Sequence, residues 1–246
     1  MRMELGLLGV LLGAGCSTMP KQQVNLEPPL HRMEDTIKES VEYPVDVHDP
    51  MEGFNRRIYS FNYYFDKFLY LPVVHSYEWV MPDYAEHRVS NFVDNVYEFS
   101  NFSNNLLQFK FKRTGITLAR VLVNTTIGIG GLWDPATGMN LATQDEDFGQ
   151  TLGHYGVGNG PFIVLPILGP SNLRDTTGSV VDASAFTYAG PPAWVDDDDV
   201  TLIFNGVTAI DKRHQESFRY YRTGSPFEYE MIRMLYTAKR ELEIAK

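Results

Sequence analysis

Residues 145–175 read DEDFGQTLGHYGVGNGPFIVLPILGPSNLRD and join a glycine-rich approach to a short apolar run. Each glycine inside an α-helix costs roughly 1 kcal/mol relative to alanine, so this density argues against a continuous helix. Glycine at such spacing supplies positive φ angles or room for close backbone approach. The glycines concerned are Gly149, Gly153, Gly156, Gly158 and Gly160.

The apolar run, residues 162–168, lies between Pro161 and Pro170 and is interrupted by Pro166. A proline within the run argues against a central β-strand, because proline donates no hydrogen bond to a neighbouring strand. We therefore expect an apolar loop or edge ribbon of fixed shape. Loops are normally polar, so the run either closes the core or lines a surface that does not face water. Composition favours the first of these two interpretations.

The composition of the whole chain indicates one sizeable domain. Its 246 residues are 43% hydrophobic and 21% charged, which is sufficient for a true core. The formal net charge of −10 argues against a nucleic-acid partner. The single cysteine, Cys16, excludes an internal disulfide.

The N-terminal sequence resembles a lipoprotein signal peptide. Residues 5–12 form an apolar run that is too short to span a bilayer, for which a helix needs about 20 residues. Arg2 precedes this run, and small residues lead to Cys16, which such signals present for acylation. The alternative is a buried N-terminal helix with an inert thiol. We expect a signal peptide at residues 1–15, a lipid-anchored flexible tether at residues 16–48 and a domain at residues 49–246.

An aromatic stripe marks the first helix of the domain. Its residues recur at steps of four and three, the spacing of one helix face, and we expect Pro72 to end the helix. The stripe either faces an ordinary core or lies in a membrane interface, which suits the neighbouring tyrosines. We assign this interface helix to Phe54, Ile58, Phe61 and Phe65, with Phe68 continuing the stripe.

Similar spacings and capping signals predict five further helices. One begins at Asp83, which forms a capping box with Glu86, and breaks at Ser100. Another covers residues 114–126, is apolar around much of its circumference and ends at a glycine turn, residues 128–131. The others are expected at residues 176–186, at residues 200–221 behind a cap at Asp199, and after a capping box of Ser225 and Glu228. The chain is therefore expected to be mainly α-helical.

The sequence contains no recognisable catalytic or cofactor motif. It has neither a G-x-S-x-G nucleophile elbow nor a P-loop, and residues 156–161 lack the spacing of a dinucleotide fingerprint. The six histidines have no metal-ligand spacing, so neither a metal nor a cofactor is expected. His154 as a general base and residues 145–147 as a catalytic acid pair stay open, although a structural histidine and a helix cap are commoner.

Four long blocks resemble the MlaA (VacJ) family of outer-membrane lipoproteins. They are DPMEGFNRRIYSFNYYFD at residues 49–66, SNFVDNVYEFSNFSNNLLQFK at 90–110, RVLVNTTIGIGGLWDPAT at 120–137 and EDFGQTLGHYGVGNGPFIVLPILGPSNLRDTTG at 146–178. The resemblance is continuous over residues 49–186 and looser at the C-terminal block SPFEYEMIRMLY.

This resemblance implies a single ring-shaped domain of amphipathic helices, lipid-anchored on the periplasmic side of the outer membrane. Ser17 after the cysteine agrees with sorting of such lipoproteins to that membrane. The ring would enclose an amphipathic channel, associate with a trimeric porin and remove mislocalised phospholipid from the outer leaflet. A soluble periplasmic carrier would receive the lipid, in retrograde intermembrane transport that maintains lipid asymmetry. No covalent chemistry is implied, so the protein is not expected to be an enzyme.

We hypothesise that the glycines and the apolar run form the lipid path. Lining or gating residues are expected to be Gly128, Gly130, Gly131, Gly149, Gly153, Gly156, Gly158, Gly160, Phe162, Leu165 and Leu168. Arg56 or Arg174 would meet a head-group phosphate, since guanidinium groups bind phosphate through paired hydrogen bonds. Two alternatives stay open: an envelope hydrolase acting on lipid or peptidoglycan, and an adaptor that binds porins without passing lipid.

Overall fold

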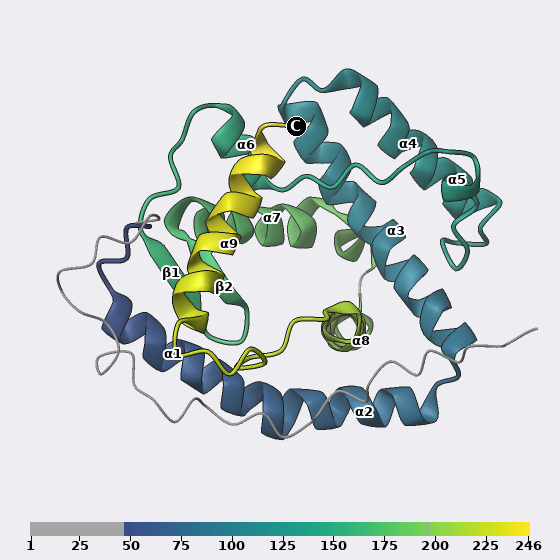
Figure 1. The fold of residues 1–246 in the computed structure, drawn as a ribbon. Helices are drawn as coiled ribbons and strands as arrows, with labels where there is room; N and C mark the ends of the chain where they lie inside the picture. The colour runs from purple at the N-terminus through teal and green to yellow at the C-terminus, as the bar shows by residue number, and fades with distance from the viewer. Residues whose placement is uncertain (1–46, 196) are drawn as a thin grey trace, which may run out of the picture.

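The computed structural model describes residues 47–195 and 197–246, which form a ring of helices with one β-hairpin (Figure 1). The mainly α-helical fold is confirmed. The expected signal peptide, Cys16 and residues 16–46 of the tether lie outside the described residues. In chain order the elements are α1 (Glu52–Phe65), the π-helical turn η2 (Asp66–Tyr70), α2 (Leu71–Val80), α3 (Asp83–Leu107), α4 (Phe111–Thr126), α5 (Pro135–Gly138), α6 (Phe148–His154), β1 (Phe162–Leu165), β2 (Gly169–Asn172), α7 (Leu173–Ala189), the 3-10 turn η3 (Pro191–Trp194), α8 (Asp198–Gln215) and α9 (Glu228–Ile244).

The helices are arranged around a central space. α1, η2 and α2 run along one side, and α3 rises from the end of α2 and packs along α4 (Figure 1). α9 passes in front of the hairpin and contacts β2 and α6. α8 is seen end-on at the inner side of the ring, in contact with α2 and α3. Three segments far apart in the sequence therefore border the centre: the hairpin, α8 and α9.

The apolar run forms a two-stranded antiparallel hairpin, so the expected edge ribbon is present. Phe162 pairs with Asn172 and Leu165 pairs with Gly169. The turn between the strands contains Ile167 at φ 69°, followed by Gly169 at φ 86°. A positive φ is rare for a β-branched residue, and the neighbouring structure must hold it there.

Two asparagines of α1 hold the open edge of β1. Asn55 donates to the Phe162 carbonyl at 3.1 Å and accepts from the Val164 N–H at 3.0 Å. Asn62, two helical turns later, donates to the Leu165 carbonyl at 2.9 Å and accepts from the Ile167 N–H at 2.7 Å. Each side-chain amide thus makes the pair of hydrogen bonds that a neighbouring strand would make to this edge. These bonds satisfy backbone groups that burial would otherwise leave unpaired.

The face of α1 that is buried here is the opposite of the one that an ordinary soluble core would bury. Phe54 and Phe68, from the aromatic stripe, are 55% and 68% exposed, while Asn55 and Asn62 are buried. The interpretation of the stripe as core-facing was therefore wrong for Phe54, Phe61 and Phe68, whereas Ile58 packs against the apolar core cluster. The helical spacing identified one face correctly, but the hydrogen bonds to the hairpin turn the opposite face inward.

Pro72 does not end the first helix. The π-helical turn η2 precedes it and places it in the first turn of α2. A missing N–H is tolerated in the first turn, so the chain continues in helical form to Val80. The π turn is thus the local adjustment that admits the proline.

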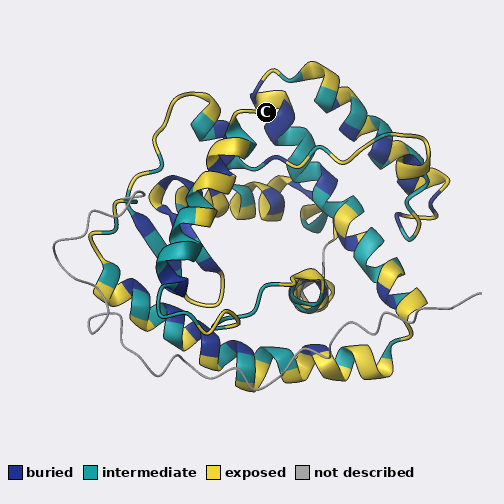
Figure 2. Ribbon diagram, in the orientation of Figure 1, coloured by how far each residue is buried: buried dark blue, intermediate teal, exposed yellow. Residues whose placement is uncertain are grey.

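α4 shows the same reversal as α1. Its buried positions are polar, namely Thr114, Thr117, Arg120 and Asn124, whereas the predicted apolar residues Leu118 and Leu122 are exposed. Arg120 lies against Glu98 of α3 at 2.6 Å. The small apolar cluster of Tyr59, Phe162, Val164 and Tyr229 packs where the hairpin meets α1 and α9. Figure 2 shows exposed positions distributed along the outer helices of the ring.

Several predicted helix ends are displaced. α3 continues through Ser100 without a break, and Pro82, not Asp83, is its N-cap residue. α8 is capped by Asp197, whose carboxylate accepts from the N–H groups of Asp199 and Val200, and it ends at Gln215. α9 begins at Glu228 rather than Ser225. Glu228 forms no capping box, because its carboxylate accepts from the Tyr59 hydroxyl and from Thr223.

Arg240 of α9 binds carboxylates from two other helices. Its guanidinium donates to the two Asp147 oxygens at 2.7 and 2.8 Å and to Asp175 at 2.8 Å. Asp147 is the N-cap of α6, and Asp175 lies in the first turn of α7. Burial alone would raise the pKa of both carboxyl groups, but the hydrogen bonds and charge of Arg240 outweigh it and lower them. One side chain therefore joins three helices.

We expect Arg240→Met to lower the free energy of unfolding by about 2–3 kcal/mol, because hydrogen bonds to buried Asp175 are lost. Lys239→Met is the matched control, since the Lys239 side chain is exposed and its change should stay within about 0.5 kcal/mol. Urea unfolding in detergent, followed by circular dichroism, measures both. Equal midpoints for the two variants would contradict this role of Arg240.

The lowered pKa values of Asp147 and Asp175 also predict a dependence of stability on pH. A carboxyl group whose folded-state pKa is lowered stabilises fully above its unfolded-state pKa, about 4, and less as the pH falls through its folded-state pKa. Below about pH 4, wild type should therefore lose stability more steeply than Arg240→Met. Urea midpoints measured over a pH series test this, and parallel curves would count against it.

Candidate functional site

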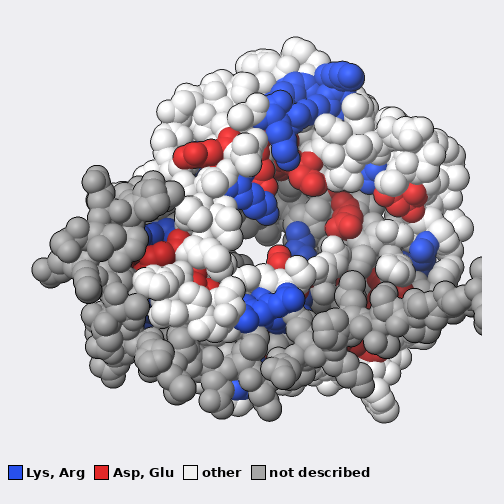
Figure 3. All heavy atoms as spheres, in the orientation of Figure 1, with Lys and Arg blue, Asp and Glu red and all other residues white. Residues whose placement is uncertain are grey.

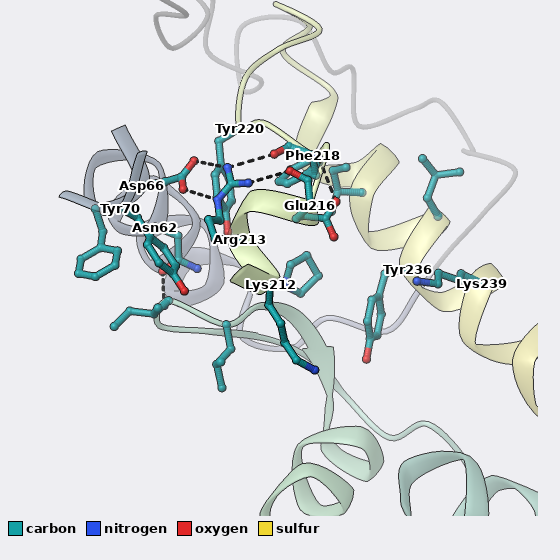
Figure 4. A pocket seen from close by; sticks show the side chains of 17 residues that line it. Asn62, Asp66, Tyr70, Lys212, Arg213, Glu216, Phe218, Tyr220, Tyr236 and Lys239 are labelled. Atoms are coloured by element: carbon teal, nitrogen blue, oxygen red, sulfur yellow. Dashed lines mark hydrogen bonds and ion pairs between the residues drawn. The ribbon is translucent and has the colours of Figure 1, made fainter. Parts of the chain in front are cut away.

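Two cavities of different character meet at the centre of the ring, where the molecular surface is visibly hollowed (Figure 3). We call the first the apolar cavity. It has a volume of about 460 Å³ and lies between η2, the hairpin turn, α8 and α9 (Figure 4). Its apolar lining includes Phe65, Ile167, Leu168, Phe218, Ile232 and Leu235.

The second, the polar cavity, has a volume of about 560 Å³. α3, α4 and the segment before α6 supply most of its lining, which includes Asn91, Asp94, Tyr97, Asn101, Asp145 and Gln215. Lys212 of α8 lines both cavities. The two spaces are therefore neighbours, and one ammonium group lies where the lining changes from apolar to polar.

The two adjacent cations of α8 have different surroundings. Arg213 donates to both oxygens of Asp66 at 2.6 and 2.8 Å, so its charge is matched within the protein. Figure 4 shows Lys212 extending away from that pair into the cavity. Within the described residues Lys212 has no ion pair within 4 Å, and its Nζ lies 3.9 Å from the ring centre of Tyr97.

The pKa of Lys212 is lowered by desolvation, which the charges of Asp94, Asp211 and Asp145 partly oppose. The side chain is accessible to solvent, yet protein surrounds it on several sides, as expected inside a ring. The pKa of Asp94 is raised, mainly by desolvation and next by the nearby charge of Asp211. Both side chains remain accessible to solvent, although nearby protein reduces the solvation of their charges.

Four of the predicted glycines are sites of close packing, among them Gly131, where a Cβ would lie 2.6 Å from the Asn95 side-chain nitrogen. A Cβ at Gly149 would lie 2.6 Å from an Asp175 carboxylate oxygen, and one at Gly153 would lie 2.5 Å from Ile244. At Gly128 it would meet two backbone carbonyl oxygens at 2.3 Å. These positions need glycine because another chain segment approaches closely.

The remaining predicted glycines serve turns or face open space. Gly130, Gly156 and Gly160 have positive φ, as the closely packed Gly131 also does, and a Cβ at Gly158 would meet nothing within 4 Å. None of the eight predicted glycines lines either cavity, whereas Gly169 of the hairpin lines the apolar one. Their positions therefore do not support a direct role in lining the cavities.

The predicted apolar residues divide between core and cavity. Phe162 is 1% exposed and packs against the rings of Tyr229 and Tyr236, so it belongs to the core, a correction to its expected lining role. Leu165 is half-buried at the end of β1. Leu168 is 76% exposed and lines the apolar cavity.

Neither predicted arginine is placed to receive a head group. Arg174 is buried and binds Asp175 at 2.8 Å. Arg56 forms ion pairs with Glu52 and Glu230. Lys212 is the cation that lines both cavities. Sequence reasoning missed it, because a lysine in the last turn of a helix is ordinary.

Two of the three acids considered for hydrolysis have structural partners, whereas the third, Asp145, lines the polar cavity without an ion pair among the described residues. Asp147 caps α6 and binds Arg240, while Glu146 is buried between Lys110 and Arg113 at 2.8 Å from each. His154 makes no hydrogen bond to an acid or hydroxyl group within the described residues. In the same part of the chain, no group of three or more potential ligands is placed to hold a metal ion.

The ring carries many exposed apolar side chains. Over the residues that the structure covers, no helix has both the length and the apolar character needed to cross a membrane. The exposed residues include Phe54, Phe61, Phe68, Leu107, Phe109, Phe111, Leu118, Leu122, Val180, Tyr188, Leu202 and Ile203. They are distributed over α1, η2, α3, α4, α7 and α8.

Comparisons with known proteins agree with this architecture. The model of the MlaA lipoprotein family matches residues 47–243. An uncharacterized protein of Rickettsia prowazekii is 38% identical over 170 residues, which are 69% of this chain and 66% of that protein. The chain thus spans about two thirds of the length of such relatives.

Relatives with a descriptive name show similar levels of identity. The intermembrane phospholipid transport system lipoprotein MlaA of Haemophilus influenzae is 34% identical over 172 residues, or 67% of this chain and 66% of that protein. Its Escherichia coli counterpart is 38% identical over 138 residues, or 54% of this chain and 55% of that one.

A solved structure from work on the "Structural basis for maintenance of bacterial outer membrane lipid asymmetry" has the same fold. It aligns with a TM-score of 0.64 at 32% identity and covers 80% of this chain and 98% of that chain. With the family match over residues 47–243, these likenesses establish that the chain belongs to the MlaA lipoprotein family.

Proposed function

We propose that the protein removes mislocalised phospholipids from the outer leaflet of the outer membrane and passes them to a soluble periplasmic carrier. The observation that carries the proposal is the junction of an apolar and a polar cavity at Lys212. Acyl chains favour the first environment and a head group favours the second, so together they form an amphipathic path. The names of the Haemophilus and Escherichia relatives, which refer to phospholipid transport, agree with this function.

The outer surface supports a position within one leaflet. Phe54, Ile58, Phe61 and Phe65 form the proposed interface helix, and the first and third of these are exposed. Helices that satisfy their own backbone hydrogen bonds can lie in the membrane interface with an apolar face among the lipid chains. Polar groups would then lie away from the lipid chains, as the buried Asn55, Thr117 and Arg120 do.

We place the protein on the periplasmic side of the outer membrane, anchored through acylated Cys16. More than one acyl chain gives lasting attachment, whereas a single myristoyl chain binds membranes only marginally. A trimeric porin is the proposed partner at the apolar outer surface, and the periplasmic carrier would meet the opposite, membrane-free side. The domain would begin at residue 49, after the tether.

The proposal requires no covalent chemistry and no cofactor. Of the three acids considered for hydrolysis, Asp145 lines the polar cavity, but Asp147, which would complete an acid pair, is engaged by Arg240. Glu146 is likewise paired with Lys110 and Arg113. Lipid movement then depends on the shape and polarity of the path.

Glycine turns remain candidates for gating, although they do not line the cavities. Gly130 and Gly156 adopt positive φ without a neighbouring atom near a hypothetical Cβ, and Gly158 is similarly unobstructed. Such turns can change conformation at low steric cost, since glycine populates both signs of φ. We propose that they allow adjoining segments to move as lipid enters.

We expect Leu168→Glu to abolish lipid removal while leaving the fold intact. Leu168 is exposed into the apolar cavity, where a carboxylate would oppose the entry of an acyl chain. In cells that lack the native protein, complementation with this variant should leave outer-leaflet phospholipid several-fold above the wild-type level. Chemical labelling of surface phospholipid provides the measurement.

Leu242→Glu is the control for this experiment, because Leu242 is also exposed but lines neither cavity. It should restore lipid asymmetry like wild type. If Leu168→Glu also restored asymmetry at equal protein level, the transport proposal would fail and an adaptor that binds porins without passing lipid would be favoured.

We expect Gly158→Val to slow lipid removal without unfolding the protein, since its Cβ has open space but its backbone becomes stiffer. Gly115→Val is the matched control, because a Cβ at Gly115 is also unobstructed and Gly115 lies inside α4, away from the glycine turns. Surface phospholipid and the thermal unfolding midpoint should be measured for both. Normal asymmetry in a folded Gly158→Val protein would refute the gating hypothesis.

A further inference from the structure

The polar cavity contains charges of both signs that the protein leaves without a direct partner. Lys212 has no ion pair within 4 Å among the described residues, and neither do the lining carboxylates Asp94 and Asp145. Attraction between Lys212 and both aspartates partly sustains the charge of the lysine. The three groups are therefore near one another but not in contact.

The other carboxylates that line this cavity are satisfied by the protein. Asp134, Glu146 and Asp147 form ion pairs with arginine or lysine. Asp182 accepts from the Phe148 N–H at 2.7 Å and from the Asn104 amide at 2.9 Å. Asp94 and Asp145 differ from these carboxylates, because neither takes part in the structural interactions described.

Lys212 is held in place without being neutralised. Its ammonium lies 3.9 Å from the ring centre of Tyr97, a cation–π contact that orients the side chain toward the polar cavity. Such a contact is weaker than a buried ion pair and leaves N–H donors available for an anion. Neighbouring Arg213, by contrast, is fully engaged by Asp66.

The order of these groups matches the order of groups along a phospholipid. The apolar cavity, with Leu168 and Leu235, comes first, Lys212 lies at the junction, and Asp94 and Asp145 line the polar cavity beyond. A phospholipid presents acyl chains, then a phosphate, then its terminal head group. With its chains in the apolar cavity, the lipid would bring its phosphate to Lys212 and its terminal group toward the two aspartates.

We propose that this site selects phospholipids whose head group carries an ammonium beyond the phosphate, such as phosphatidylethanolamine, over those with a neutral terminal group, such as phosphatidylglycerol. The inference rests on the proposed function, because it assumes that lipid occupies the two cavities. An ammonium group would compensate Asp94 and Asp145, which lose solvation when the site fills. Both carboxylates are accessible to solvent, so a glycerol head group that fills the cavity would displace water from them without supplying a cation.

The test is a competition on the purified, full-length lipoprotein. Wild-type protein is incubated with vesicles of equal phosphatidylethanolamine and phosphatidylglycerol content, reisolated, and its bound lipid quantified by mass spectrometry. We expect phosphatidylethanolamine to be enriched several-fold over its share in the vesicles. Equal occupancy by the two lipids would overturn the selectivity inference while leaving lipid transport intact, whereas absence of any bound lipid would count against the proposed function itself.

Two variants separate the contributions of the opposite charges. Asp94→Asn combined with Asp145→Asn should reduce the enrichment several-fold without reducing total bound lipid, because the phosphate contact remains. Lys212→Gln should reduce binding of both lipids. Unchanged lipid ratios in the double variant would contradict the assignment of the aspartates.

Controls use charges outside the cavities. Lys112→Gln and Asp199→Asn change exposed residues that line neither cavity, so both should keep the wild-type lipid ratio. Soluble phosphoethanolamine in excess distinguishes a whole-lipid site from a site for the free head group. It should not displace bound lipid, because the acyl chains supply part of the affinity, and efficient displacement would overturn the assignment to lipid.

Discussion

The closed shape of the ring depends on the hydrogen bonds and ion pairs that Arg240 makes. Its guanidinium binds the N-cap of α6 through Asp147 and the first turn of α7 through Asp175. α9 is the last helix of the chain, so this contact ties the C-terminal end to the central segment. Gly149 and Gly178 complete the junction, because a Cβ at position 178 would lie 2.4 Å from the Gly149 nitrogen. Charge and close backbone packing thus act at one place, and the position of α9 beside the hairpin follows from it.

The same physical logic extends to the inward faces of the helices. A protein whose helices expose apolar side chains must still provide internal partners for its buried polar groups. Asn55 and Asn62 meet the free edge of β1, and Arg120 lies between Glu98 and Asp134. These inward polar groups specify the geometry that a large apolar core provides in an ordinary soluble domain.

Sequence reasoning predicted the helical class, the main helices and the ribbon, because periodic spacing and proline positions report local structure directly. It could not tell which face of α1 turns inward, since a stripe such as Phe54 to Phe68 has the same period whether it meets core or lipid. It also placed the first turn of α9 at Ser225, because a capping box is a local pattern. In the folded chain the Glu228 carboxylate instead accepts a hydrogen bond from the distant Tyr59 hydroxyl. Lys212 escaped notice for a related reason: its significance lies in what surrounds it in space.

The hairpin turn connects the hydrogen bonding of α1 to the lining of the candidate site. Ile167 is held at φ 69°, a conformation that costs a β-branched residue about 1–3 kcal/mol. The Asn62 side chain accepts from its N–H at 2.7 Å and fixes the turn from α1. Leu168 follows immediately and lines the apolar cavity that it shares with Lys212. A buried asparagine on one side of the ring therefore positions the apolar wall of the path, while α8 independently supplies its cation. Different elements set the two halves, so the apolar wall and the charged groups can vary separately. If lipid follows this path as proposed, its passage and the head-group preference need not change together.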